Sequence, residues 1–514
     1  MSRALFKSTS AVSSMTLLSR IMGFVRDMVL ASVFGAVAGF DAFLVAFKIP
    51  NFMRRLFAEG AFSQAFVPVL SEYRQTRSET EVQDFVNHVA SALAVALLII
   101  VVFAEILTPL LVMLFAPGFI NEPERFGLAR QMLQITFPYI LLISLAAFAG
   151  AVANTYGSFA VPAFTPTLFN IALIIAAVVG SHYFAHPIIV LAWGVMAGGI
   201  VQLAFQWPML RKWQLLPRFR LNWEDPGVRR VMKLMVPALF GVSVAQLSLL
   251  VDTIFASFLR VGSISWLYYS DRIIYFPLGM FGVAIATVIL PHLSRKHASH
   301  SSGEFSEVLD WGLRLVVVIG LPAAVGILVL AGPLMATLFG YGKFNAFDVV
   351  MGSRSLMAYA IGLPAFMLIK VLASGFYSRQ DIRTPVRIAV IAMTTCMVLN
   401  GVLIFPLAHA GLALATSLGA IVNAGLLGWI LLRREIYQPR YDWRKYVARV
   451  LLANAVLAVL LLILAPGLHT WLGWRWYQRG SCLALLMGIA IVGYFGCLWL
   501  SGMRWHHFKV QAAD

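Results

Sequence analysis

The chain has 514 residues, of which 60% are hydrophobic and only 12% are charged. Soluble domains carry about 25% charged residues, so this composition indicates a protein that crosses a membrane several times. The formal net charge of +17 would suit a nucleic-acid-binding protein, but the basic residues are spread over loops beside apolar stretches. Nucleic acid is therefore excluded as a partner, because a basic excess next to a membrane explains the charge.

About fourteen apolar stretches follow one another along the chain, and each is long enough to cross about 30 Å of hydrocarbon as a helix. The expected fold is an all-α polytopic membrane protein with about 14 transmembrane helices. No loop between them is long enough to fold as a separate domain. The expected spans are residues 9–35, 40–68, 88–114, 130–154, 159–181, 187–209, 232–258, 265–292, 311–338, 348–374, 385–405, 409–432, 447–466 and 481–502.

Lys and Arg are distributed unequally over the loops between these spans. One set of alternate loops, taken with both termini and the residues flanking them, holds about 24 of the basic residues, and the opposite set holds about 5. Basic loops stay in the cytoplasm when a membrane protein inserts. The distribution therefore predicts that both termini are cytoplasmic.

Two pairs of segments suggest an internal repeat. Residues 61–71 resemble residues 284–294 at a shift of 223, and the turn at 155–162 resembles the turn at 376–385 at shifts of 221 to 223. Six spans separate equivalent positions, so the copies have the same orientation in the membrane. This predicts two six-helix lobes related by a pseudo-two-fold axis along the membrane normal, a plan known among transporters. The expected division is an N-lobe, a C-lobe and a C-terminal helix pair with its tail, at residues 1–220, 221–440 and 441–514.

Charged side chains are unusually dense in the first two spans. Burying a cation in a membrane costs about 2.5–3.5 kcal/mol on insertion scales, so such a cluster indicates function. Asp41, Lys48 and Arg55 are seven residues apart, which places them on one face of a helix. The candidate site residues are Arg20, Arg26, Asp27, Asp41, Lys48, Asn51, Arg54, Arg55 and Glu59, with Asp271 and Arg272 in the eighth span.

Two interpretations of this cluster remain open. Arg20 with Asp27, and Arg55 with Glu59, can form ion pairs that only hold helices together. The cluster contains six cations against four acids, however, and this surplus favours an anionic ligand or a solvated vestibule. Arginine outnumbers lysine in the cluster, which suits bidentate binding of phosphate or carboxylate oxygens.

Three further charged residues lie inside spans. Asp252, near the end of the seventh span, either binds a cation or proton for energy coupling or is a hydrogen-bonded cavity residue. Arg314 and Arg354 lie nearer span ends, where long basic side chains are expected to extend towards the interface.

Four motifs carry a resemblance to a known family. They are Ser19–Asp27 (SRIMGFVRD), Pro50–Ser63 (PNFMRRLFAEGAFS), Tyr268–Arg272 (YYSDR) and Gly375–Asp381 (GFYSRQD). Together with Asp41-Ala42-Phe43 they resemble the lipid II flippase family MurJ, also called MviN, and the resemblance covers essentially the whole chain. The two N-terminal motifs are specific, because other transporters of the same superfamily do not usually carry them.

The resemblance implies the fold of the multidrug/oligosaccharidyl-lipid/polysaccharide exporter superfamily, with two lobes around a central cavity and two extra C-terminal helices that form a groove for a lipid tail. It implies that the chain flips lipid II, the undecaprenyl-pyrophosphate-linked disaccharide-pentapeptide, across the bacterial inner membrane. Tyr275 departs from relatives, which often carry a polar or acidic residue there. The cavity residues that the resemblance implies are Arg20, Arg26, Arg54, Arg272, Asp27, Asp41, Glu59 and Asp271.

The resemblance also implies what drives transport and what binds. Asp252 matches an acid of the sodium site of some relatives, so sodium, a proton gradient or the membrane potential is the expected energy source. The expected partners are lipid II, membrane lipid and cell-wall synthesis proteins. No other cofactor and no metal is expected.

Three rival functions are weighed against this one. Another exporter of the superfamily that carries drugs should have an acidic or aromatic cavity rather than surplus arginine, whereas a flippase for another polyprenyl-linked oligosaccharide remains an alternative. A membrane glycosyltransferase should place catalytic acids in a sizeable outer loop, and the loops here are short. A scaffold without transport would leave the arginines without a purpose. The chain also lacks a P-loop, a Gly-x-Ser-x-Gly motif and a His-Glu-x-x-His motif, so it is not expected to be an enzyme.

Overall fold

The computed structural model describes residues 3–54, 62–299, 302–439 and 442–503, and within these ranges the regular elements are all helical. The all-α class is confirmed. Ten helices in the described ranges are long and apolar enough to cross a membrane, so the number of fourteen spans stays a prediction. One of the ten, α16 (Arg383–Arg433), covers two expected spans, 385–405 and 409–432. The backbone breaks between them at Ala408, where φ is 48°.

The chain divides into two compact units, Met1–Gly262 (unit 1) and Ser263–Asp514 (unit 2). Unit 1 contains α1 (Arg3–Phe34), α2 (Ala38–Arg54), α3 (Ser63–Thr76), α4 (Glu79–Ile106), α5 (Thr108–Phe115), η2 (Pro117–Asn121), α6 (Pro123–Thr136), α7 (Tyr139–Thr155), α8 (Ala160–Val178), η3 (Gly180–His182), α9 (Ile189–Lys212) and α10 (Pro226–Ser257). Unit 2 contains α11 (Ser263–Pro277), η4 (Leu278–Gly282), α12 (Val283–Ala298), α13 (Ser302–Val329), α14 (Ala331–Leu338), α15 (Ala346–Tyr377), α16, α17 (Trp443–Leu464), α18 (Leu468–Gly473) and α19 (Trp476–Leu500).

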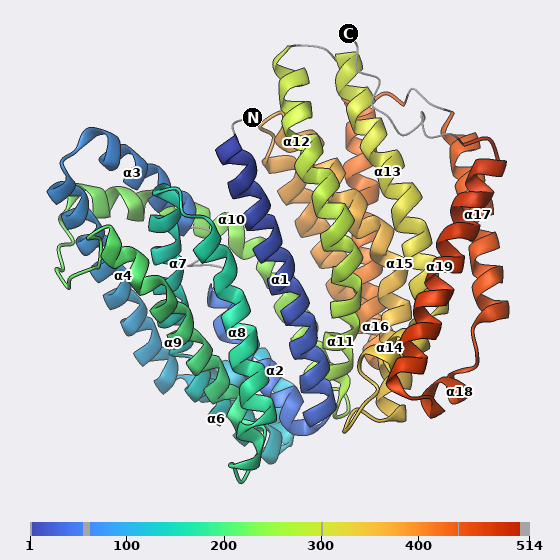
Figure 1. The fold of residues 1–514 in the computed structure, drawn as a ribbon, viewed down its shortest axis with the longest axis horizontal. Helices are drawn as coiled ribbons and strands as arrows, with labels where there is room; N and C mark the ends of the chain where they lie inside the picture. Colours follow the sequence, from blue (N-terminus) through green and yellow to red (C-terminus); the bar gives the residue numbers. More distant parts are fainter. Residues whose placement is uncertain (1–2, 55–61, 300–301, 440–441, 504–514) are drawn as a thin grey trace. The chain divides into compact units, whose positions relative to one another are not determined.

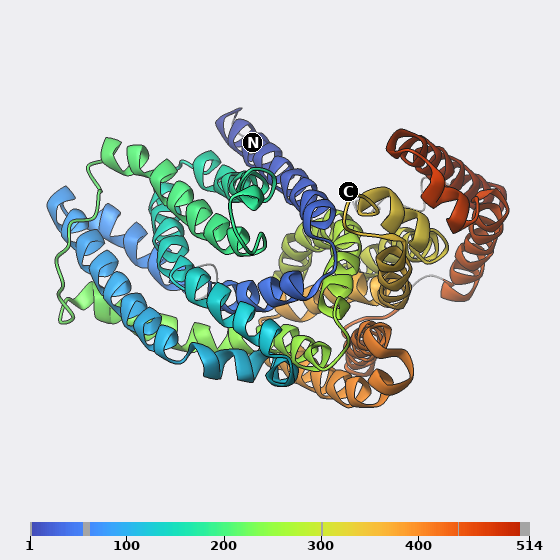
Figure 2. The same ribbon diagram turned by 90° about the horizontal axis from the view of Figure 1, so that it is seen from below.

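Local sequence sets where several of these helices begin. The Ser78 hydroxyl accepts a hydrogen bond from the amide of Glu81, and the Ser78 amide donates to the Glu81 carboxylate, so a capping box starts α4. Asp225 accepts from the amides of Gly227 and Val228 and stands before Pro226, which suits the first position of α10. In unit 1, α8 packs between α1 and α9, as Figures 1 and 2 show in blue and green.

The helix bounds support the internal repeat. The last residues of α10, α13 and α14 lie 223 positions after the last residues of α1, α4 and α5, and α14 and α16 begin 223 residues after α5 and α8. The two halves of the sequence therefore form the same succession of helices. Even so, α10, the first helix of the second copy, packs on α3 and α4 and belongs to unit 1. The lobe boundary at residue 220 remains a prediction from the repeat.

The C-terminal helices α17 and α19 pack on each other and on α13, and Figure 1 shows them in red. A buried polar cluster joins the start of α17 to α13. Asp310 of α13 accepts hydrogen bonds from Tyr437 Oη at 2.5 Å and Trp443 Nε1 at 2.9 Å, and its other oxygen lies 3.0 Å from Arg314 Nε. The expectation that Arg314 extends to the interface is wrong, because Asp310 lies one turn away on the same face and the pair is buried.

A second buried arginine joins the helix pair to α14. Arg479 is 6% exposed, and its guanidinium donates hydrogen bonds to four backbone carbonyls, those of Ala336, Gly340, Leu472 and Trp474, at 2.7–3.0 Å. Three of its nitrogens therefore donate to carbonyls at the end of α14 and around α18, where helical backbone bonding runs out. Trp471, which is fully buried, adds a hydrogen bond from its Nε1 to Thr337 at 2.9 Å.

Removing this arginine is expected to loosen the helix pair. Arg479→Met keeps most of the side-chain volume but removes four hydrogen bonds to buried carbonyls, and we expect it to destabilise the protein by about 2 kcal/mol or more. Thermal unfolding of the purified protein in detergent measures this. Lys343→Met, which removes an exposed cation, is the matched control and should unfold at the wild-type temperature. Equal unfolding temperatures for both variants would contradict the assignment.

Candidate functional site

The densest polar contact of α1 is centred on Arg26. Its Nε and one terminal nitrogen donate to the same oxygen of Asp27 at 2.9 and 2.7 Å, and the other terminal nitrogen donates to Asn170 Oδ1 of α8 at 2.9 Å. Arg26 is 7% exposed and Asp27 is 1% exposed. The predicted pair of Asp27 with Arg20 is therefore replaced by one with Arg26, and Arg20 is exposed.

The Asn170 side chain of α8 also lies beside Gly23 of α1. A Cβ atom at Gly23 would lie 3.5 Å from Asn170 Nδ2, an ordinary van der Waals contact. Asn170 also donates to the carbonyl of Ser19 at 3.2 Å, which fixes the amide across the two helices. Asn170 was missed from the sequence, because a lone asparagine in an apolar span carries no signal until its neighbour is known.

The charged residues Lys48 and Asp41 on one face of α2 contact two different helices of unit 1, α10 and α6. Lys48 Nζ donates to Thr253 Oγ1 of α10 at 2.6 Å, and the half-buried Asp252 is the next residue along α10. This contact places a predicted substrate-binding cation and the predicted ion-coupling acid on adjoining segments. Arg54, at the end of α2, donates from Nε to Asn51 Oδ1 at 3.0 Å, so these two candidates do lie together.

Asp41 lies at the other end of α2 and is completely buried. One of its oxygens accepts from Arg125 of α6 at 3.1 Å and from the backbone amide of Gly262 at 2.7 Å. Arg125 is 1% exposed, also bonds to Glu122 at 2.9 Å and lies over the Phe119 ring at 4.2 Å. Sequence reasoning counted Arg125 with the loop cations, since it stands just before an apolar span.

The remaining candidates are placed as follows. Arg272 in unit 2 donates to Tyr268 Oη at 3.1 Å and lies over the same ring at 4.8 Å, one turn earlier on α11. Asp271 is half-buried and Tyr275 is exposed. Arg55 and Glu59 lie outside the described residues. That all candidates line one cavity stays a prediction.

Three cations of the first two spans have different acceptors in unit 1. Arg26 donates to the Asp27 carboxylate, Lys48 to the Thr253 hydroxyl and Arg54 to the Asn51 amide oxygen. The Asp41 carboxylate of α2 bonds to Arg125 of α6. That these cations receive an anionic ligand stays a prediction from the sequence.

Sequence comparison gives a consistent family. The family model described as Lipid II flippase MurJ matches residues 30–475. A probable lipid II flippase MurJ from Vibrio cholerae is 46% identical over 99% of this chain and 98% of its own length. The lipid II flippase MurJ of Burkholderia cenocepacia is 42% identical over 99% of both chains.

Solved structures agree with the sequence relatives. A lipid II flippase MurJ in an inward closed conformation superposes with a TM-score of 0.78 at 26% identity, covering 95% of this chain and 99% of that one. An inward-facing multidrug resistance MATE family transporter of the MOP superfamily gives a TM-score of 0.67 at 12% identity, over 85% of this chain and 98% of that one. The second likeness concerns the fold alone.

Proposed function

The chain belongs to the lipid II flippase MurJ family, and from this premise we propose that it flips lipid II across the bacterial inner membrane by alternating access. Two kinds of observation support the proposal. The family membership supports lipid II as the substrate. The burial of Arg26 and its bonds to Asp27 and Asn170 support a role for this residue in binding the diphosphate.

The physical problem is to carry a diphosphate, sugars and a peptide with carboxylates through hydrocarbon. The polyprenyl tail can stay in lipid, but the headgroup needs a replacement for water. Guanidinium groups suit this task, because their planar donors match phosphate oxygens two at a time. Arg26 has its side chain fixed before substrate arrives, so little conformational entropy is lost on binding.

Release of the headgroup requires that its binding to the cations be reversible. Asp27 shares the Arg26 guanidinium and therefore competes with a phosphate for the same donors. Lys48 donates to the Thr253 hydroxyl and Arg54 to the Asn51 amide oxygen, and these bonds orient both cations. We assign Arg26, Lys48, Arg54 and Arg20 of unit 1 to the headgroup in this scheme, and Arg272, Arg55, Glu59 and Asp271 remain assigned from sequence.

Asp41 fits a structural role better than a place in the cavity. Its buried carboxylate holds both Arg125 and the Gly262 amide, which ends unit 1. It would then fix the turn after α10 while the cationic residues handle substrate. The same scheme gives the C-terminal pair α17 and α19 the groove for the polyprenyl tail, as the family resemblance implies.

A reconstituted assay tests the function directly. Purified protein in vesicles that carry lipid II in one leaflet should expose it in the other, and a polyprenyl phosphate without sugars should move more slowly. Imposed sodium, proton and voltage gradients then identify the driving force. Vesicles in which lipid II fails to move under every gradient would contradict the proposal.

Asp252 is expected to set the ion dependence. Asp252→Asn removes a carboxylate beside Thr253, which holds Lys48, so we expect flipping to lose its response to a sodium or proton gradient. The measurement is the flipping rate with and without each gradient. Glu124→Gln, an exposed acid of α6, is the control and should respond like wild type. An unchanged response in Asp252→Asn would remove the coupling role.

Three further proposals concern the membrane topology, the partner proteins and the absence of catalysis. The distribution of basic loops supports a topology with both termini in the cytoplasm. The family function supports association with cell-wall synthesis proteins, which make and use the same lipid. Without a catalytic motif in the sequence, we propose transport without bond-breaking chemistry.

A further inference from the structure

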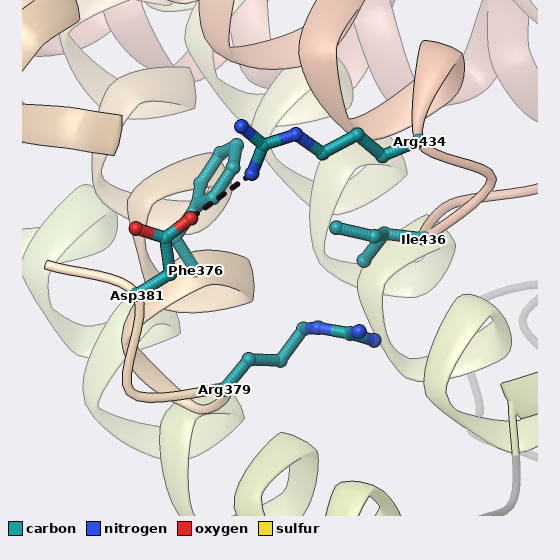
Figure 3. Close-up of a pocket in the computed structure, with 5 residues that line it drawn as sticks. All are labelled: Phe376, Arg379, Asp381, Arg434 and Ile436. Carbon is teal, nitrogen blue, oxygen red and sulfur yellow. Dashed lines mark hydrogen bonds and ion pairs between the residues drawn. The ribbon is translucent and has the colours of Figure 1, made fainter. Parts of the chain in front are cut away.

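A pocket in unit 2 lies outside the residues assigned to transport. It has a volume of about 390 Å³ and is lined by Phe376, Arg379, Asp381, Arg434 and Ile436. Figure 3 shows the side chains of Arg379 and Arg434 approaching it from opposite sides. Both arginines are exposed, and they belong to the turns that follow α15 and α16. The motif Gly375–Asp381, which the transport scheme leaves unused, forms one wall.

The pocket has a fixed cation and a second, unanchored one. Arg434 donates to Asp381 Oδ2 at 3.1 Å and to Thr384 Oγ1 at 3.4 Å, which orients its guanidinium. Asp381 is itself held by the amide of Thr384 at 3.0 Å and its hydroxyl at 2.6 Å. Within the described part of unit 2, no hydrogen bond of the Arg379 guanidinium is present. The lining therefore carries two cations against one acid.

The acid stays ionised across the physiological range. Partial burial alone would raise the pKa of Asp381, but the hydrogen bonds from Thr384 and from the Arg434 guanidinium outweigh it and hold the pKa below its ordinary value. Asp381 therefore stays charged and keeps the Arg434 guanidinium oriented. The net charge of the pocket remains positive.

The other copy of the repeat fills the same place with aromatic rings. The corresponding turn in unit 1 lies between α7 and α8, and there Tyr156 stacks on Trp213 with ring centroids 5.1 Å apart. Arg74 covers Tyr156 at 4.2 Å and donates to the carbonyl of Thr155. At the shift of 223 residues, Trp213 corresponds to Ile436 and Arg211 to Arg434. The two copies of the repeat therefore differ here in their aromatic residues, because unit 1 has a stacked Tyr156–Trp213 pair where the pocket of unit 2 is lined by Ile436 and Arg379.

We propose that this pocket binds a phosphate group between Arg379 and Arg434, supplied by an anionic phospholipid headgroup or by free phosphate. Two guanidinium groups facing one pocket can share the oxygens of one phosphate, and Phe376 and Ile436 limit its size. The pocket lies at the ends of spans on the side that the basic loops assign to the cytoplasm, where anionic headgroups gather. The inference is independent of the proposed flipping.

Binding of two probes to the full-length protein in neutral detergent tests this proposal. Short-chain phosphatidylglycerol and inorganic phosphate are titrated calorimetrically, and phosphatidylglycerol is expected to bind saturably. Arg379→Gln and Arg434→Gln should each weaken binding about tenfold, since each removes charge-assisted hydrogen bonds. Arg379→Gln breaks no described contact within the protein, so this variant is expected to keep the native fold and its result reports binding alone. Arg433→Gln, which removes an exposed arginine stacked on Trp429 at 5.1 Å, is the matched control.

The outcomes distinguish a phospholipid headgroup from free phosphate, and failure of this proposal from failure of the proposed flipping. Competition by inorganic phosphate at equal strength would assign the site to free phosphate, and its failure to compete would assign it to a lipid headgroup. Binding that persists unchanged in the Arg379→Gln/Arg434→Gln double variant, or that falls equally in Arg433→Gln, would overturn the proposal. Arg26→Ala should keep this binding, so a loss of flipping in that variant and a loss of this site are distinguishable.

Discussion

Arg26→Ala is expected to abolish lipid II flipping, by at least about 100-fold, while the protein still inserts in the membrane. The reason is that the guanidinium supplies fixed donors for a diphosphate inside a region with little water. The measurement is the flipping rate in vesicles that contain equal amounts of folded protein. Arg229→Ala, an exposed arginine at the start of α10, is the control and should flip normally.

The contact with Asp27 makes a second variant necessary. Removing Arg26 alone leaves a carboxylate that is 1% exposed without the partner seen here, which can cost about 3–5 kcal/mol. The double variant Arg26→Ala/Asp27→Asn removes both charges and should recover stability. We expect flipping to stay lost in it. Normal transport by the double variant would show that Arg26 serves only as a counter-charge.

The second large effect concerns the pair of Arg125 with Asp41. Arg125→Met should destabilise the protein by about 3–5 kcal/mol, because it strips a fully buried carboxylate of its charged partner. Thermal unfolding in detergent measures the loss. Arg130→Met, on the same helix but exposed, is the control and should be close to wild type.

A compensating variant shows whether the buried charge is the cause. Arg125→Met/Asp41→Asn is neutral and keeps an amide oxygen for the Gly262 amide, so most of the stability should return. We expect flipping to return with it, as the structural role of Asp41 requires. A double variant that is stable but does not flip would instead place Asp41 among the residues that handle lipid II.

Much of the architecture follows from the sequence because the membrane restricts it severely. Apolar stretches of sufficient length must become helices, since no water is available for the backbone. The repeat was visible at a shift of 223, and the same shift recurs in the bounds of α10, α13 and α14. The density of charge in the first two spans likewise identified Arg26, Lys48 and Arg54 as candidates, because a charge in a span is costly wherever it points.

What the sequence by itself determined is therefore the helical class, the repeat, the family and the segment in which the candidate charges are concentrated. Only the tertiary structure decided which partner each charge has. Asp27 bonds to Arg26 and not to Arg20, while Arg125 and Arg479, which read as loop residues, are buried. The physical reason is that periodicity fixes the face on which a side chain lies, but the partner on that face comes from another helix, distant in sequence, whose approach depends on packing.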